Sequence, residues 1–99
     1  MIVYGIESCG DCRSCKAAFD QAGVTYEYRS FSKDVRYLKE FLKIRDTNPL
    51  FDEVKKNGGV GIPCIVTDDG TVTLDWEQFL PEGFHVQAGP ACRLDGKGC

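Results

Sequence analysis

Short apolar runs alternate with longer amphipathic segments along the chain, and this pattern predicts a mixed α/β domain. Runs rich in β-branched and aromatic residues predict four strands, over residues 2–4, 24–28, 64–66 and 71–74. Apolar residues spaced three or four apart predict helices between them. The first helix is expected to begin at the cysteine cluster, to bury Cys12, Cys15 and Phe19, and to end at Gly23.

Two further helices are predicted between the second and third strands. One covers residues 33–45, is capped by Ser32, and buries an apolar stripe made of Val35, Leu38, Phe41 and Leu42. Asn48 followed by Pro49 is typical of an N-cap and a first helical residue, so a short helix is expected through Lys56. A last short helix is predicted over residues 76–80, after a hairpin at Asp69-Gly70.

The order of these elements predicts the topology of the sheet. A strand, a helix and a second strand at the start imply a parallel pair. The hairpin at the end adds antiparallel strands. We therefore predict a four-stranded mixed β-sheet flanked by helices, formed by residues 1–81. Residues 82–99 are punctuated by glycine and are predicted to be an irregular C-terminal tail.

Length and charge narrow the class of protein. The 99 residues suffice for one domain with a modest core. The net charge of −3 argues against nucleic-acid binding, which needs a basic face. No apolar stretch is long enough to span a bilayer, and the first residues lack the layout of a signal peptide. We expect a cytoplasmic protein without a membrane partner, and a monomer is favoured.

The six cysteines are the unusual feature of the composition. In a cytoplasmic protein, cysteines in such numbers more often do redox chemistry or bind metal than form a disulfide scaffold. Cys9-Gly10-Asp11-Cys12 is a C-x-x-C motif where a loop leads into the first helix. The unsatisfied N–H groups and the positive dipole at a helix start stabilise a thiolate. Cys9 is therefore the candidate nucleophile, and Cys12 is placed to resolve a mixed disulfide.

The chain resembles the glutaredoxin family. The resemblance rests on the first strand, the C-x-x-C motif, the Gly23-Val24-Thr25-Tyr26 segment after the helix, and Gly61-Ile62-Pro63 before a strand. It implies a thioredoxin-like fold and a disulfide oxidoreductase with Cys9 and Cys12 as its catalytic residues. It also implies a cis bond before Pro63, with the backbone of Ile62 pairing with a bound peptide or thiol.

Two departures from the family concern the source of electrons. Ile6 stands where many glutathione-using members carry lysine, and Leu74-Asp75-Trp76-Glu77 lacks their glycine pair. Charged contacts to a glutathione carboxylate are therefore not expected at these positions. The resemblance implies protein or low-molecular-weight disulfides as substrates and no permanently bound cofactor. Electrons would come from glutathione or from a reductase.

The remaining cysteines leave alternatives open. Cys15 extends the motif to C-x-x-C-x-x-C, a spacing found in iron–sulfur proteins. A carrier of zinc or an iron–sulfur cluster is thus an alternative, with a set drawn from Cys9, Cys12, Cys15, Cys64, Cys92 and Cys99. Burial as a small apolar residue also explains Cys15. Cys64 either lies near Cys9 or packs in the sheet. Cys92 and Cys99 relay electrons, bind zinc, or are exposed thiols in the tail. A module with inert cysteines is a third possibility.

Overall fold

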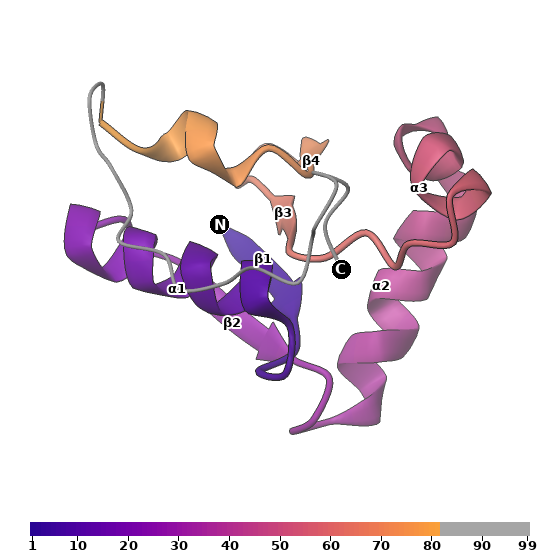
Figure 1. Cartoon of the computed structure of the whole chain (residues 1–99), viewed down its shortest axis with the longest axis horizontal. Coiled ribbons are helices and arrows are strands. Elements are labelled where there is room, and N and C mark those ends of the chain that lie inside the picture. Colours follow the sequence, from indigo (N-terminus) through magenta and orange to yellow (C-terminus); the bar gives the residue numbers. More distant parts are fainter. Residues whose placement is uncertain (82–99) are drawn as a thin grey trace.

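A computed structural model of the chain describes residues 1–81 as a mixed sheet with helices on its two faces (Figure 1). The predicted tail, with Cys92 and Cys99, lies outside the described residues. The elements follow in the order β1 (Ile2–Gly5), α1 (Gly10–Ala22), β2 (Glu27–Ser30), α2 (Val35–Thr47), the 3₁₀ helix η1 (Pro49–Phe51), α3 (Asp52–Lys56), β3 (Cys64–Val66), β4 (Val72–Thr73) and the 3₁₀ helix η2 (Trp76–Phe79).

The four strands lie in the order β2-β1-β3-β4, which confirms the predicted mixed sheet. β1 pairs with β2 in parallel, and Val3 lies opposite Tyr28. β1 pairs with β3 antiparallel, and Tyr4 lies opposite Cys64. β3 and β4 form the predicted antiparallel hairpin. β1 is therefore central, and the loop that follows it starts from the middle of the sheet.

Alternate side chains of β1 divide the core into two clusters, because successive residues of a strand point to opposite faces. Val3 belongs to what we call the Phe19 cluster, whose buried members are Val3, Cys15, Ala18, Phe19, Ile65 and Trp76. Tyr4 belongs to the Phe41 cluster, whose buried members are Tyr4, Cys9, Cys12, Phe41, Phe51, Ile62 and Cys64. α1 supplies half of the buried members of the first cluster and α2 packs on the second, so these helices lie on opposite sides of the strands (Figure 1).

The end of α1 confirms the prediction at Gly23 but moves the start of the next strand. The N–H groups of Gly23 and Val24 donate to the carbonyls of Asp20 and Phe19, which closes the last turn. The Val24 N–H is thus still hydrogen-bonded to the helix. Parallel pairing begins only where the Glu27 N–H donates to the Met1 carbonyl. The predicted strand over residues 24–28 was wrong in its bounds for this reason.

α2 corrects two predictions. Its N-cap is Asp34, whose carboxylate accepts from the Arg36 N–H at 2.9 Å, whereas the predicted cap Ser32 donates its hydroxyl to Glu7. Two members of the predicted apolar stripe are exposed, Val35 at 59% and Leu42 at 37%.

The aromatic ring of Phe41 explains which face of α2 is buried. It packs against the rings of Phe31 and Phe51, so the buried line of the helix runs through Phe41 with Leu38 and Ile44 beside it. Leu42 follows Phe41 by one residue and is therefore turned about 100° away from that line. Val35 lies in the first turn and is exposed there.

The second half of the chain follows the predictions closely. Asn48 accepts a hydrogen bond from the Leu50 N–H at 2.9 Å, with Pro49 as the first residue of η1. β3 has the predicted bounds, whereas β4 is shorter than predicted and the last helix is a 3₁₀ helix. Within residues 1–81, no helix combines the length and the apolar character needed to cross a membrane.

Candidate cysteine site

Cys9 occupies the N-cap position of α1, which confirms that the helix begins at the cysteine cluster. Its backbone is extended, with φ −86° and ψ 123°, and its sulfur accepts a hydrogen bond from the Cys12 N–H at 3.4 Å. Its carbonyl accepts the first helical bond, from the Arg13 N–H. The side chain is only 4% exposed. The sulfur therefore lies against the unsatisfied N–H groups of the first helical turn.

The two sulfurs of the motif differ in acidity. The pKa of Cys9 is lowered from its ordinary 9.0 to about 7. The largest cause is the hydrogen bond from the Cys12 side chain, and the N–H groups of Cys12 and Asp11 act in the same direction, against burial. The same hydrogen bond, together with burial, raises the pKa of Cys12. Cys9 is thus the sulfur that ionises first.

Ile62, which precedes Pro63, belongs to the core cluster of Cys9 and Cys12. The bond between Ile62 and Pro63 is cis, as the resemblance implied. Ile62 is 7% exposed and belongs to the Phe41 cluster together with Cys9 and Cys12. Ile62 and the C-x-x-C motif, which lie about fifty positions apart in the sequence, therefore share one buried cluster.

Arg45 fixes the loop that leads to this segment. Its guanidinium donates to the carbonyls of Gly59 and Val60, both at 2.9 Å. These bonds connect the last turn of α2 to the residues just before Gly61-Ile62-Pro63. The sequence pattern did not reveal this contact, because Arg45 is one of several charged residues in a segment predicted to face solvent.

The other two described cysteines are buried on opposite faces of the sheet. Cys64 is fully buried in the Phe41 cluster, so it packs in the sheet and also shares the cluster of Cys9. Cys15 is fully buried in the Phe19 cluster, with Phe19 and Trp76. Burial raises the pKa of each thiol to about 12. Both side chains are therefore thiols at neutral pH.

The three cysteines of the C-x-x-C-x-x-C motif do not converge. Cys9 and Cys12 belong to one cluster, and Cys15 belongs to the other. Across residues 1–81, no three or more Cys, His, Asp or Glu side chains are grouped so that they could hold a metal ion. Cys92 and Cys99, the remaining candidates for such a site, lie outside the described residues.

Tyr28 and Gly5 complete the surroundings of Cys12, and sequence analysis missed both. A Cβ on Gly5 would lie 2.7 Å from Cys12 Sγ and 2.8 Å from Tyr28 Oη, so only glycine leaves room for these two atoms. The ammonium group of Lys16 lies 4.3 Å from the centre of the Tyr28 ring. The register of β2 on β1, which the sequence does not show directly, brings Tyr28 to this place.

Glu7 holds the loop before the cysteines. Its carboxylate accepts hydrogen bonds from the hydroxyls of Ser30 and Ser32, both at 2.7 Å. These bonds lower the pKa of Glu7 to about 2. Its carbonyl accepts from the Arg13 guanidinium at 2.8 Å. The loop from β1 to Cys9 is thereby tied both to the end of β2 and to α1.

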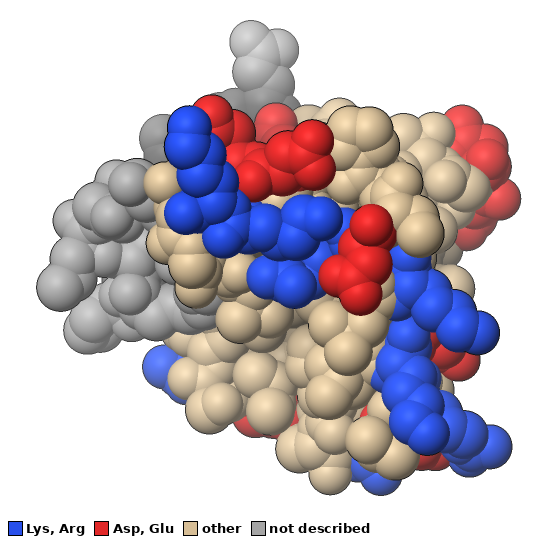
Figure 2. Space-filling model, turned by 90° about the vertical axis from the view of Figure 1, so that its right-hand side faces the viewer, with Lys and Arg blue, Asp and Glu red and all other residues tan. Residues whose placement is uncertain are grey.

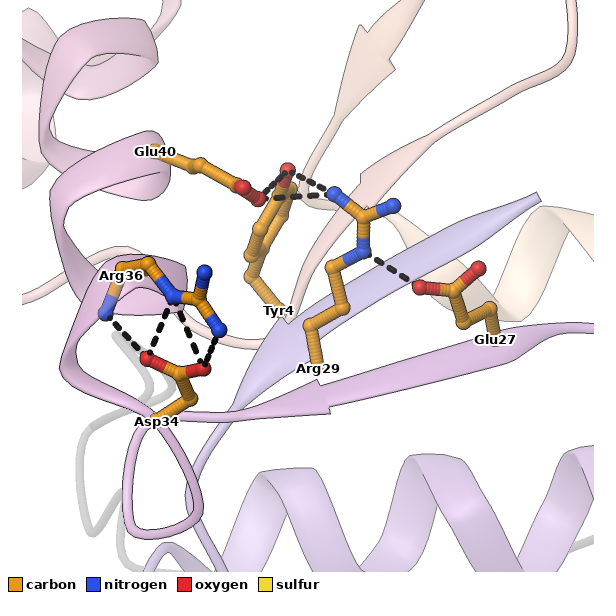
Figure 3. A network of polar contacts seen from close by, with 6 residues as sticks. All are labelled: Tyr4, Glu27, Arg29, Asp34, Arg36 and Glu40. Atoms are coloured by element: carbon orange, nitrogen blue, oxygen red, sulfur yellow. Dashed lines mark hydrogen bonds and ion pairs between the residues drawn. The ribbon is translucent and has the colours of Figure 1, made fainter.

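A second polar network joins β1, β2 and α2 (Figure 3). The Tyr4 hydroxyl and the Arg29 guanidinium both donate to Glu40, at 3.0 and 2.7 Å. Arg29 also pairs with Glu27 on its own strand. The network lies on the α2 side of the sheet and connects that helix to β1 and β2.

The outer face of α2 is charged. Figure 2 views the molecule from the side of α2 and α3, where basic and acidic side chains are interspersed over the surface. Arg36, Lys39 and Lys43 are exposed on α2. This mixture is typical of a solvated face and agrees with the sequence pattern.

The fold and the site together define an α/β protein with a four-stranded mixed sheet and a cysteine pair at the start of its first helix. The chain is 35% identical, over 74 residues, to a protein of Haemophilus influenzae (strain ATCC 51907 / DSM 11121 / KW20 / Rd) described as uncharacterized. The match covers 75% of this chain and 86% of that protein. The chain belongs to the same family as this protein. No family model matches the chain, and no solved structure matches it.

Proposed function

We propose that the protein is a thiol–disulfide oxidoreductase of the glutaredoxin-like class, with Cys9 as the nucleophile and Cys12 as the resolving cysteine. The observation that carries the proposal is the position of the Cys9 sulfur at the N-cap of α1, where its pKa is lowered to about 7. At that pKa about half of the Cys9 side chains are thiolates at neutral pH, and the thiolate is the attacking species in disulfide exchange.

The reaction follows from the order in which the two sulfurs ionise. The Cys9 thiolate attacks one sulfur of a substrate disulfide, a mixed disulfide forms, and the first substrate thiolate leaves. Cys12 then gives up its proton and attacks the Cys9 sulfur. The second substrate thiolate leaves and is protonated. Two electrons pass to the substrate, and Cys9 and Cys12 end as a disulfide.

The thioredoxin-like form of the fold is part of this proposal. A parallel β1–β2 pair, an antiparallel β1–β3 pair and a cysteine motif at the start of α1 support it. The Phe41 cluster supports Ile62 and Pro63 as the substrate-binding segment, because it holds Ile62 with both catalytic sulfurs. The exposed backbone of an incoming peptide would pair with that of Ile62.

Substrates and donors are proposed by chemical class. Disulfides of proteins or of small thiols are the substrates that a Cys9 thiolate with Cys12 as resolving cysteine can reduce. Oxidised enzyme is returned to the dithiol by glutathione or by a reductase. We expect this activity in the cytoplasm, where thiol pools keep such cysteines reduced.

The proposal is tested with three variants and a disulfide-linked peptide, with reduction followed by mass spectrometry. Cys9→Ser is expected to abolish catalysis, because the only sulfur with a lowered pKa among residues 1–81 is removed. Cys12→Ser is expected to accumulate a mixed disulfide between Cys9 and half of the peptide. Cys15→Ala, which alters a buried thiol of the other cluster, serves as the control and should retain activity. Full activity in Cys9→Ser would refute the proposal.

A further inference from the structure

The Tyr28 hydroxyl is the one buried side-chain polar atom of residues 1–81 that has no hydrogen-bond partner. Burying such a group without a partner costs free energy, so its presence calls for an explanation. The hydroxyl does not face apolar surroundings alone. It shares with Cys12 Sγ the space that Gly5 leaves open. It lies close enough to lower the pKa of Cys12, although no hydrogen bond of ordinary geometry joins the two atoms.

Cys12 needs a hydrogen-bond donor at one stage of the proposed reaction. In the dithiol, its proton is shared with the Cys9 sulfur, which is the largest reason why the pKa of Cys12 is raised. Once Cys9 is bound to substrate as a mixed disulfide, that sulfur carries no negative charge. Cys12 must then become a thiolate inside the protein. The backbone N–H of Ile6 is one donor to it, and a buried anion with so few donors is costly.

The Tyr28 hydroxyl is suited to donate rather than to accept a proton. Burial raises the pKa of Tyr28, and the nearby Cys12 and Glu7 act in the same direction. The phenol therefore keeps its proton at neutral pH. The Lys16 ammonium group over the ring adds a positive charge next to the same site.

We propose that Tyr28 is a catalytic residue for the second half of the reaction, in which its O–H donates a hydrogen bond to the Cys12 thiolate. This inference rests on the proposed function. The step is balanced without a further reagent. Cys12 loses its proton, its sulfur forms a bond to Cys9 Sγ, and the bond between Cys9 Sγ and the substrate sulfur breaks. The substrate leaves with the electron pair and takes up a proton, while Tyr28 keeps its own.

A purely structural role for the hydroxyl predicts a different result. Tyr28→Phe retains the ring and its contact with Lys16 and removes only the oxygen. Because that oxygen has no partner, its loss is expected to leave stability unchanged or slightly increased. A slower second chemical step in Tyr28→Phe, with stability retained, is therefore expected only from the catalytic role.

The test uses the full chain with Cys92→Ser and Cys99→Ser, so that tail thiols do not react. The probe is 5,5′-dithiobis(2-nitrobenzoate), which releases one coloured thiolate when Cys9 attacks it. A second is released when Cys12 resolves the mixed disulfide. The two releases are followed by stopped-flow absorbance in single turnovers. Tyr28→Phe is compared with Tyr26→Phe, whose hydroxyl donates to Asp20 at the surface.

We expect Tyr28→Phe to slow the second release by about tenfold or more, the factor that corresponds to a hydrogen bond with a charged group. The first release should keep its rate, and Tyr26→Phe should match the parent in both. An unchanged second release in Tyr28→Phe would overturn the inference, as would an equal slowing of both releases.

Failure of the proposed function would look different. In that case the parent chain itself would release no second thiolate, or Cys9→Ser would release both. If Tyr28→Phe fails to fold, Lys16→Met gives the second measurement. Loss of the ammonium group over the Tyr28 ring weakens the hydroxyl as a donor, so it should slow the second release by a smaller factor and leave the first unchanged. An unchanged second release in Lys16→Met would then overturn the inference.

Discussion

Cys9 and Cys12 share one proton, and their different surroundings decide which sulfur keeps it. Cys9 accepts hydrogen bonds from the Cys12 side chain and from backbone N–H groups of the first helical turn. Cys12 lies deeper and donates to Cys9, so its own ionisation is opposed. The helix start alone therefore does not set the acidity of Cys9, because the largest contribution comes from its neighbour in the motif.

The pH dependence of alkylation tests this division of roles. Cys9 should react with iodoacetamide at a rate that rises with pH and levels off above a midpoint near 7, since only the thiolate reacts. In Cys12→Ala the largest cause of the lowered pKa is gone, so the midpoint should move upward, toward 9.0. Cys15→Ala should keep the midpoint near 7. Rates are read for each cysteine by mass spectrometry, and a midpoint that stays near 7 in Cys12→Ala would contradict the assignment.

At the scale of the elements, the site depends on how α2 holds the loop before β3. Arg45 stands in the last turn of α2 and donates to two carbonyls of that loop. The Arg45 side chain is 22% exposed, and its bond to Gly59 is partly buried whereas its bond to Val60 is exposed. α2 thus contributes to the site through Arg45, which does not need to contact the cysteine sulfurs.

Arg45→Met should separate binding from chemistry. We expect a loss of about 1 kcal/mol in the free energy of unfolding, since two carbonyls lose a donor but can turn to water. KM for a disulfide-linked peptide should rise, while alkylation of Cys9 keeps its pH midpoint. The matched control is Arg36→Met on the same helix, where an exposed pair with Asp34 is lost and stability should change by less than about 0.5 kcal/mol. Equal effects of the two variants on KM would contradict a role for Arg45 in placing the loop.

At the scale of the whole molecule, both sulfurs of the C-x-x-C motif belong to one core cluster, whereas Tyr28 packs against the other. The Phe41 cluster includes both sulfurs of the motif, and the Phe19 cluster includes Cys15 among aromatic side chains. Phe19 meets the rings of Tyr26, Trp76 and Phe79, all at centroid distances of 5.4 to 6.3 Å. Each cluster contains a fully buried phenylalanine, and the two differ in which cysteines they hold.

Phe41→Leu and Phe19→Leu make this difference measurable. Each should lower the free energy of unfolding by about 1–3 kcal/mol, because a fully buried ring is replaced by a smaller side chain. Only Phe41→Leu should also speed the alkylation of Cys9, whose burial depends on that cluster. Urea unfolding gives the first quantity, and alkylation below the unfolding transition gives the second. Faster alkylation in Phe19→Leu alone would contradict the separation.

The sequence by itself determined the features that local interactions fix. Helix starts and ends depend on hydrogen bonds between residues only a few positions apart. Examples are the start of α1 at Cys9, its end at Gly23, and the start of η1 at Asn48-Pro49. The bounds of β3 follow from a compact apolar run. These features are legible in a single sequence because the partners that create them are neighbours in it.

Tertiary structure alone decided the remaining features. The packing of the Phe41 ring against Phe31 and Phe51 determined which face of α2 is buried, and Leu42 is exposed as a result. Packing placed Cys15 and Cys12 in different core clusters. The β1–β2 register brought Tyr28 beside Cys12. Each of these depends on which distant segments pack together, and hydrophobic periodicity carries no information about the partner.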